Sequence, residues 1–331
     1  MQISIIGAGS WGTALGIMAA RQGHEVLLWA RRAEAAQRIE AERENAHYLP
    51  GHRLPQRVRA TADFEEVLRN AEMVIYALPS HAARDFARAA RPLLAPGMLL
   101  VSAAKGIEAE TGARVSEIFA EELGDGVRVA ALSGPSFARE VVAGHPTAIV
   151  AASHSLDDAR RVQLALSYEN LRIYANDDLT GTEMGGAVKN VIALAAGMVV
   201  GLGLGANSVA ALITRGLAEM TRLAVAVGAR FESMLGLAGV GDLVLTCTSE
   251  QSRNRRVGRE LGRGRRLEEV LGEMHEVVEG VRTTHAVRLL AARRGVRMPI
   301  TDAVHAVLYG GYGVRQAVTE LMSRPLRDEF D

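Results

Sequence analysis

Short apolar runs recur through the first half of the chain, and a stretch with helical periodicity follows each of them. The runs lie at residues 1–6, 25–30, 71–78, 98–103, 127–132 and 148–152. They are nearly continuous in apolar residues rather than alternating, which is typical of strands in a parallel sheet that helices cover on both faces. The pattern therefore predicts an α/β, Rossmann-like domain with a mostly parallel sheet over residues 1–180.

The pattern changes near residue 178, after which helical periodicity dominates. One long helix is expected to begin around Thr180 and a second to cover about residues 208–228. Residues 190–214 contain no Asp, Glu, Lys, Arg or His, and such a stretch is long enough to cross a bilayer. Glycines interrupt it, so we interpret it as two buried helices joined by a loop at 201–207 rather than as a membrane span. Residues 181–331 are thus predicted to form an all-helical domain.

A glycine-rich turn directly follows the first strand. Gly7, Gly9 and Gly12 have the spacing G-x-G-x-x-G, with a strand pattern before them and a helix pattern after them. In that context the first glycine makes a tight turn, the second lets a pyrophosphate approach the backbone, and the third lets the helix pack closely on the sheet. The helix N-terminus favours an anion. The motif predicts dinucleotide binding, and the alternative is an ordinary glycine-rich turn.

The end of the second strand bears on which dinucleotide binds. An NAD site usually has Asp or Glu here, which accepts a hydrogen bond from the ribose 2′-hydroxyl. This chain has Arg31 and Arg32 instead, and two guanidinium groups suit a 2′-phosphate. NADP(H) is therefore favoured as the cofactor, with NAD(H) as the second candidate. The alternative is that the two arginines only begin a solvated helix.

Composition narrows the classes of function. Lys+Arg and Asp+Glu both number 38, so the formal net charge is zero, and aromatic residues make up 4% of the chain. Both values argue against a dedicated binder of nucleic acid or of membrane surfaces. The single cysteine, Cys247, cannot form an internal disulfide, which predicts a reduced, cytoplasmic protein. We expect Cys247 to be a small buried residue, and the histidine and cysteine pattern predicts no metal site.

Only two of the 38 basic residues are lysine, Lys105 and Lys189. Arginine stays protonated at any working pH, whereas a buried lysine can lower its pKa and exchange a proton. Both lysines are therefore candidates for chemistry, and the alternative is that two surface lysines persisted by chance. Lys189 and Asn190 stand on an otherwise apolar helix, where buried polar groups need partners.

Other polar candidates stand at strand ends and in the helical half. Ligands of parallel sheets bind beyond the carboxyl ends of the strands, where this chain has Lys105 and the segment 133–136. Asp242 stands in a glycine-flanked turn, where it can accept a hydrogen bond from a lysine or a hydroxyl group. Arg253 and Asn254 are forked donors suited to phosphate oxygens. Most of the seven arginines between positions 253 and 266 are interpreted as a solvated face, because acidic residues dilute them.

Eight motifs together resemble one family, the bacterial NAD(P)-dependent glycerol-3-phosphate dehydrogenases. In chain order they are GAGSWGTAL, AAKGIE, SGPSFARE, GGAVKNVIALAAG, ALITRGLAEM, GLAGVGDLVLTCTS, QSRNRR and VVEG. They cover essentially the whole chain. The resemblance implies a Rossmann-like domain followed by a helical domain, with the site between them. It also implies reversible reduction of dihydroxyacetone phosphate to sn-glycerol 3-phosphate, a phospholipid precursor, and it makes a homodimer plausible.

Matching the motifs residue by residue implies a set of roles. Lys189 becomes the proton donor and acceptor, and Lys105 touches both cofactor and substrate. Further substrate contacts are implied at Gly134, Ser136, Asp242, Ser252, Arg253 and Asn254. Further cofactor contacts are implied at Ser10, Trp11, Arg31, Arg32, Ala138, Arg253, Val277 and Glu279. Relatives often carry tyrosine or phenylalanine where this chain has Trp11.

The resulting hypothesis is hydride transfer to the ketone carbon while a cationic Lys189, oriented by Asp242, protonates the oxygen. Two alternatives stay open at this point. One is a reductase of the same plan that acts on a small 2-keto or 3-hydroxy acid and presents a carboxylate to Arg253. The other is a cofactor-sensing protein without turnover, against which the two retained lysines argue, because a sensor needs no proton transfer.

Overall fold

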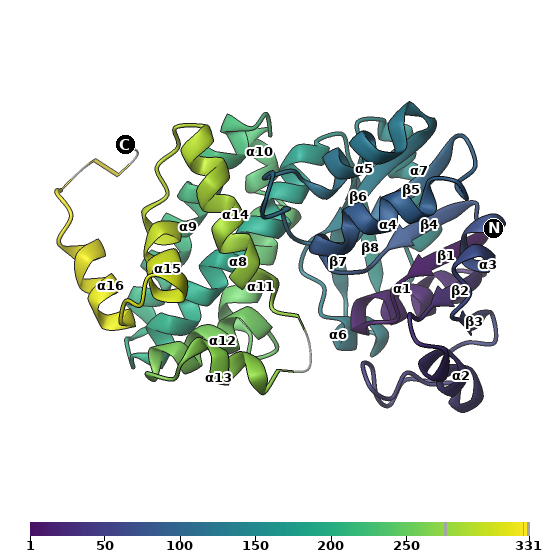
Figure 1. The fold of residues 1–331 in the computed structure, drawn as a ribbon, viewed down its shortest axis with the longest axis horizontal. Helices are drawn as coiled ribbons and strands as arrows, with labels where there is room; N and C mark the ends of the chain where they lie inside the picture. Colours follow the sequence, from purple (N-terminus) through teal and green to yellow (C-terminus); the bar gives the residue numbers. More distant parts are fainter. Residues whose placement is uncertain (275–276, 327, 330–331) are drawn as a thin grey trace.

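The computed structural model describes residues 1–274, 277–326 and 328–329, and it has a sheet half and a helical half that lie side by side (Figure 1). The N-terminus lies at the outer end of the sheet half, and the last helix, α16 (Val314–Met322), lies at the opposite end of the molecule (Figure 1). The last strand ends at Asn176 and the first long helix begins at Leu179. The change from sheet to helix thus takes place within a few residues.

The first half forms one eight-stranded sheet in the order β3-β2-β1-β4-β5-β6-β7-β8. All neighbouring strands are parallel except β6 and β7, so the predicted, mostly parallel sheet is confirmed. From β3 to β6 the order is that of dinucleotide-binding sheets. The strands are β1 (Gln2–Ile6), β2 (Glu25–Trp29), β3 (Val58–Thr61), β4 (Met73–Tyr76), β5 (Met98–Ser102), β6 (Val127–Ser133), β7 (Thr147–Ala152) and β8 (Leu171–Asn176).

Successive residues of the central strands enter two different cores. In β4, Met73 and Ile75 pack in one apolar cluster, while Val74 and Tyr76 pack in another on the opposite face. Both faces are covered by helices, which is why the central strands are continuously apolar. The helices of this half are α1 (Ser10–Arg21), α2 (Ala33–Glu42), α3 (Phe64–Arg69), α4 (Ala83–Ala90), α5 (Val115–Leu123), α6 (Ala138–Val142) and α7 (Leu156–Leu166).

The helical half is built around α8 (Leu179–Gly201), almost all of whose residues are buried. Its length and apolar character come from burial inside the protein: 89% of its most apolar stretch is enclosed by other parts of the chain. The second apolar stretch, Phe231–Thr248, is 44% buried. The other helices of this half are α9 (Ala206–Ala226), α10 (Phe231–Met234), α11 (Asp242–Thr248), α12 (Arg253–Gly262), α13 (Leu267–Gly272), α14 (Glu279–Arg293), α15 (Pro299–Tyr309) and α16 (Val314–Met322).

Glycines bring α8 and α12 into direct backbone contact. A Cβ added at Gly197 would lie 2.1 Å from the carbonyl oxygen of Arg255, and one added at Gly258 would lie 2.0 Å from that of Leu194. Both distances are far below any real contact, so larger residues would force the helices apart. Gly197, within the apolar stretch, therefore serves helix packing, whereas Gly203 and Gly205 lie in the loop between α8 and α9.

The expectation of two buried helices holds for α8 and is wrong for α9. Only one side of α9, which includes Gly216, Met220 and Leu223, is buried. Its first two turns, which contain Ala210 and Ala211, are largely exposed. Uncharged small residues are compatible with both environments, which is why the sequence pattern did not separate them.

Candidate active site

Lys189, Asp242 and Lys105 form one hydrogen-bonded cluster at the junction of the two halves. The Nζ atom of Lys189, on α8, donates to Oδ1 of Asp242 at the start of α11. The Nζ atom of Lys105, which follows β5, donates to Oδ2 of the same carboxylate at 2.8 Å. Lys189 and Asp242 are 5% and 1% exposed, respectively. The two lysines of the chain thus share one buried carboxylate.

Burial and charge shift the pKa values of this cluster in a way that suits proton exchange. The pKa of Lys189 is lowered to about 7: burial is the largest cause, the carboxylate of Asp242 opposes the shift, and the charge of Lys105 adds to it. For Asp242, burial alone would raise the pKa, but the two ammonium groups hold it below its usual range. Asp242 therefore stays ionised, and Lys189 can gain or lose a proton near neutral pH.

Two adjacent glycines allow α8 to lie close to the turn before Asp242 and to the side chain of Lys105. A Cβ added at Gly185 would lie 2.3 Å from the carbonyl oxygen of Ala238, in the turn that precedes Asp242. One added at Gly186 would lie 2.6 Å from Oγ of Ser133 and 3.4 Å from Cγ of Lys105. The glycine pair four and three residues before Lys189 is therefore required for the cluster to form.

Asp242 was expected in a glycine-flanked turn, and its position differs from that expectation. A π-helical segment, η3 (Leu237–Gly241), leads directly into α11, and Asp242 is the first residue of that helix. The glycines at 239 and 241 belong to this π-helical segment. π-Helical turns are uncommon and are frequently found at functional sites.

Thr246 is a member of the cluster that the sequence analysis missed. Its hydroxyl accepts a hydrogen bond from Nζ of Lys189 at 2.8 Å and donates to the main-chain oxygen of Asp242 at 2.6 Å. Its spacing of four residues from Asp242 on a helix was the available signal. The neighbouring Cys247 is 1% exposed, and burial raises its pKa to about 12, so it is the inert buried residue that was expected.

A chain of side-chain amides connects the cluster with α12 and α14. Nδ2 of Asn190 donates to the main-chain oxygen of Lys105 at 3.1 Å. Oδ1 of Asn190 accepts from Nδ2 of Asn254 at 2.9 Å, and Oδ1 of Asn254 accepts from the main-chain N–H of Gly280 at 3.0 Å. Asn254, expected as a phosphate donor, thus already uses one N–H and its oxygen within the protein.

The predicted strand-end residues lie beside the lysines. The main-chain oxygen of Gly134 accepts hydrogen bonds from Lys105 Nζ at 2.9 Å and from Oγ of Ser136 at 3.0 Å. Gly134 has φ +133°, and a Cβ there would lie 2.9 Å from Cα of Ile149. Ala138 begins α6, just after this segment.

The glycine loop has the geometry of a dinucleotide cradle. A Cβ at Gly12 would lie 2.0 Å from the main-chain oxygen of Gly7, whereas a Cβ at Gly9 would meet nothing within 4 Å. Gly9 caps α1, so a pyrophosphate has room to approach the backbone here, and the N-terminus of a helix favours an anion. Ser10 and Trp11 form that first turn.

The remaining predicted cofactor residues lie at three places. Arg31 and Arg32 are exposed beyond the end of β2, and Arg32 caps α2. Val277 is 40% exposed. Glu279 begins α14, and its carboxylate accepts hydrogen bonds from the N–H of Ser80 at 3.1 Å and from its hydroxyl at 2.9 Å.

Two predicted substrate residues begin α12. Ser252 is 2% exposed and caps the helix by accepting from the N–H of Arg255 at 3.2 Å. Arg253 is exposed on the first turn. Arg255, from the run expected to be mostly solvated, is an exception, because it is 8% exposed and pairs with Glu250.

The fold thus brings Lys105, Gly134, Ser136, Lys189, Asp242 and Asn254 into one hydrogen-bonded network. The glycine loop, Arg31 and Arg32 are outside this network. They follow β1 and β2, whose carboxyl ends share one edge of the sheet with the end of β5, where Lys105 lies. Among the residues that the structure describes, no group of three or more metal-binding side chains is found.

Comparisons with known proteins agree along the whole chain. Residues 2–159 match the family model of the NAD-dependent glycerol-3-phosphate dehydrogenase N-terminus, and residues 178–319 match that of the C-terminus. The chain is 51% identical to the glycerol-3-phosphate dehydrogenase (NAD(P)+) of Citrifermentans bemidjiense over 99% of this chain and 98% of that protein. It is also 51% identical to the enzyme of that name from Rhodospirillum rubrum, over 99% of this chain and 93% of that protein.

A solved structure shows the same fold. The crystal structure of glycerol-3-phosphate dehydrogenase from Coxiella burnetii superposes with a TM-score of 0.94. Its sequence is 40% identical, and the match covers 98% of this chain and 99% of that one.

Proposed function

The chain belongs to the family of NAD-dependent glycerol-3-phosphate dehydrogenases, and we propose that Lys189, Asp242 and Lys105 form the centre at which it reduces dihydroxyacetone phosphate. The reaction is the reversible, NAD(P)H-dependent formation of sn-glycerol 3-phosphate, which supplies phospholipid synthesis. One observation carries the proposal: a buried carboxylate joins the two lysines of the chain, one from each half. Membership in this family also sets aside the 2-keto or 3-hydroxy acid reductase and the sensor without turnover.

Lys189 is proposed to be the proton donor for reduction. A protonated lysine has three N–H donors, and those of Lys189 already reach Asp242 and Thr246. The third is available for the carbonyl oxygen of the substrate, where negative charge develops. Lys189 stabilises that charge and then transfers its proton, which leaves a neutral amine that is protonated again from solvent. In the reverse reaction the neutral amine accepts the proton of the hydroxyl group.

Lys105 is proposed to position the substrate. It directs two donors to Gly134 and Asp242, and its third is free to bind substrate on the cofactor side of the site. The phosphate is assigned to Arg253, the hydroxyl of Ser252, the backbone at Gly134, Ser136 and the remaining N–H of Asn254. Charge-assisted hydrogen bonds of this kind orient the phosphate and compensate its negative charge.

The cofactor is assigned to residues 1–180 as its binding domain, with the helical residues 181–331 as the substrate and catalytic domain. Gly7, Gly9, Ser10, Trp11 and Gly12 would hold the pyrophosphate, and Arg31 with Arg32 the 2′-phosphate. Ala138, Arg253, Val277 and Glu279 complete the proposed contacts. When bound, the nicotinamide supplies the hydride. These residues orient it toward the substrate beside Lys189.

The function and the role of Lys189 can be tested together by following NADPH absorbance in the presence of dihydroxyacetone phosphate. We expect absorbance to fall, and kcat/KM for reduction to decrease as the pH rises through about 7, because burial lowers the pKa of Lys189 to that value and reduction needs the ammonium form. Oxidation of glycerol 3-phosphate should show the opposite dependence. Absence of turnover would refute the function, and turnover with equal rates from pH 6 to 9 would refute only the role of Lys189.

Replacing Arg31 by alanine should weaken the binding of NADPH more than the binding of NADH. Loss of a charge-assisted hydrogen bond to the 2′-phosphate should raise KM for NADPH roughly 10- to 100-fold, while KM for NADH should change little. Arg160→Ala on α7 is the matched control, since Arg160 is exposed and pairs with Asp157. Equal changes for both cofactors in the Arg31 variant would rule out a 2′-phosphate contact.

We further propose a cytoplasmic homodimer. The single, unpaired cysteine suits a reducing compartment. Large apolar side chains stand exposed on the helical half, among them Phe231 and Leu235 at 54% and Met322 at 81%, as a subunit interface would require. Sedimentation analysis of the purified protein tests the stoichiometry.

A further inference from the structure

The loop that carries Lys105 belongs to the sheet half by sequence but packs on the helical half. We call residues 103–114, between β5 and α5, the Lys105 loop. Its Ile107 is 3% exposed and lies in the apolar core that α8 organises. The main-chain oxygen of Lys105 accepts from Asn190 of α8. The position of Lys105 therefore depends on contacts with the helical half.

A buried ion pair fixes the far end of this loop to the same helix. Nη1 of Arg114 donates to Oε2 of Glu183 at 2.7 Å, and Oε1 of Glu183 accepts from the N–H of Ser116 at 2.9 Å. Arg114 and Glu183 are 9% and 8% exposed. Both ends of the Lys105 loop are thus attached to α8, on which Lys189 lies.

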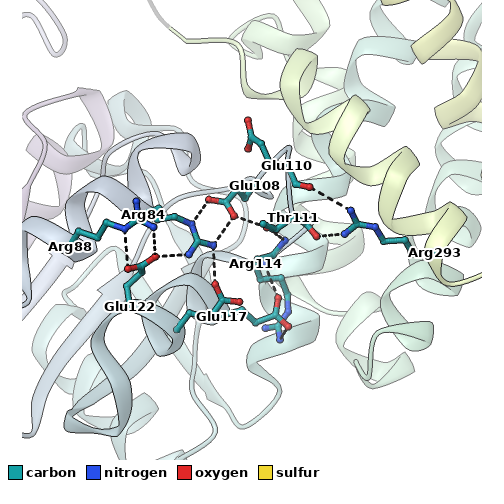
Figure 2. A network of polar contacts seen from close by, with 11 residues as sticks. Arg84, Arg88, Glu108, Glu110, Thr111, Arg114, Glu117, Glu122 and Arg293 are labelled. Atoms are coloured by element: carbon teal, nitrogen blue, oxygen red, sulfur yellow. Dashed lines mark hydrogen bonds and ion pairs between the residues drawn. The ribbon is translucent and has the colours of Figure 1, made fainter.

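The tip of the loop is held by Arg293, the last residue of α14 (Figure 2). Its Nη1 donates to the main-chain oxygen of Thr111, and its Nη2 to that of Glu110 at 3.5 Å. The adjacent Gly112 has φ +75° and lies against Leu290 and Arg293. Figure 2 shows Arg293 reaching the tip from the helical half.

Arg84 stiffens the loop from within the sheet half. Its guanidinium makes two hydrogen bonds of 2.8 Å to Glu108, which lies inside the loop, and it also bonds Glu122 of α5 (Figure 2). Glu108 in turn accepts from the hydroxyl of Thr111. A loop stiffened in this way transmits a displacement of its tip to its base, where Lys105 lies.

We propose that Arg293 is a positioning residue that holds the Lys105 loop so that the Lys105 ammonium stays against Asp242. This inference rests on the role of Lys105 proposed above. Among the described residues, the hydrogen bonds of Arg293 go to main-chain oxygens of the loop, so any effect on the site would pass through the loop to Lys105. The alternative is an exposed surface contact without kinetic consequence, which is the usual outcome for exposed arginines.

Because Arg293 is exposed, Arg293→Gln should unfold at the same urea concentration as the wild type. With saturating NADPH, its KM for dihydroxyacetone phosphate should rise roughly three- to thirtyfold, with a smaller change in kcat. Arg88→Gln is the matched control: Arg88 belongs to the same polar network and pairs with Glu122 on α5. The KM and kcat of Arg88→Gln should equal those of the wild type.

A double-variant cycle with Lys105→Met separates positioning from a direct or purely structural effect. If Arg293 acts through Lys105, Arg293→Gln should change KM less than about twofold when Lys105 is already methionine. The pH profile gives a second readout. The charge of Lys105 lowers the pKa of Lys189, so a displaced Lys105 should move the alkaline limb of reduction to higher pH.

Two results would overturn the inference. One is an unchanged KM for dihydroxyacetone phosphate in Arg293→Gln. The other is that Arg293→Gln raises this KM by the same factor whether residue 105 is lysine or methionine. A Lys105→Met enzyme that performs as the wild type would instead remove the proposed role of Lys105 itself. The positioning of the loop and the function of Lys105 are therefore tested by different members of one set of four proteins.

Discussion

Lys189→Arg should fold and bind NADPH, yet lose about 10²- to 10⁴-fold in kcat for reduction. The guanidinium keeps the positive charge beside Asp242, and it can still stabilise charge on the substrate oxygen. It cannot release a proton, because arginine stays protonated at any working pH. The substitution therefore removes proton transfer while it keeps the local charge.

Two comparisons isolate this effect. Lys189→Met removes the charge with little change in side-chain length, and it should be at least as inactive. Lys105→Arg is the comparison at the only other lysine: because its proposed role needs a cation that donates hydrogen bonds but releases no proton, kcat should stay within about tenfold of the wild type. Urea unfolding and NADPH titration establish that each variant is intact. Lys189→Arg with more than a tenth of wild-type kcat would contradict the assignment.

The sequence was sufficient for features whose chemistry restricts the residue type. The glycine loop follows from steric limits, since a Cβ at Gly12 would collide with the main chain of Gly7. The two lysines stood out because arginine replaced lysine everywhere else. The central strands were predictable because both of their faces enter apolar cores.

Edge strands and strand direction were not accessible in the same way. β3 and β8 were missed, and they are the two edges of the sheet. In β8, Leu171 and Ile173 are buried while Arg172 and Tyr174 are exposed, so no continuous apolar run marks the strand. The antiparallel pairing of β6 with β7 depends on how the connection packs, which local pattern does not encode.

The sharing of Asp242 by both lysines also could not be predicted. Asp242 was assigned to Lys189 alone, and its bond to Lys105 joins residues 137 positions apart. Only the docking of the Lys105 loop on α8 brings them together. Asn254 shows the converse: its side chain suits phosphate, but the fold uses most of its hydrogen-bonding groups for Asn190 and Gly280.

Asp242→Asn should have the largest combined effect on stability and turnover. Asp242 is 1% exposed and bonds both ammonium groups. An amide of the same shape removes the shared counterion, which leaves Lys105 an unpaired cation and forces the buried Lys189 to release its proton near neutral pH. Breaking a buried ion pair from one side costs about 3–5 kcal/mol of unfolding free energy, and urea denaturation measures that loss. Asp157→Asn is the control, since Asp157 is an exposed partner of Arg160.

Turnover should fall in the same variant by a route that pH can reveal. The carboxylate raises the pKa of Lys189 against the effect of burial, so its removal lowers that pKa further and leaves a neutral amine at pH 7. Reduction should then drop at least about 10²-fold at neutral pH and recover partly as the pH falls, because acid restores the ammonium group. Lys189→Arg should show no such recovery, since it already carries a permanent charge.

Adding Lys105→Met to Asp242→Asn distinguishes charge imbalance from simple loss of packing. The second change removes the ammonium group of Lys105, which has lost its counterion, so part of the lost unfolding free energy should return even though two site residues are now altered. It also removes the charge that lowers the pKa of Lys189, so the alkaline limb of any residual reduction should move to higher pH. If the double variant is instead less stable than Asp242→Asn, the two lysines are not held in place by their shared carboxylate.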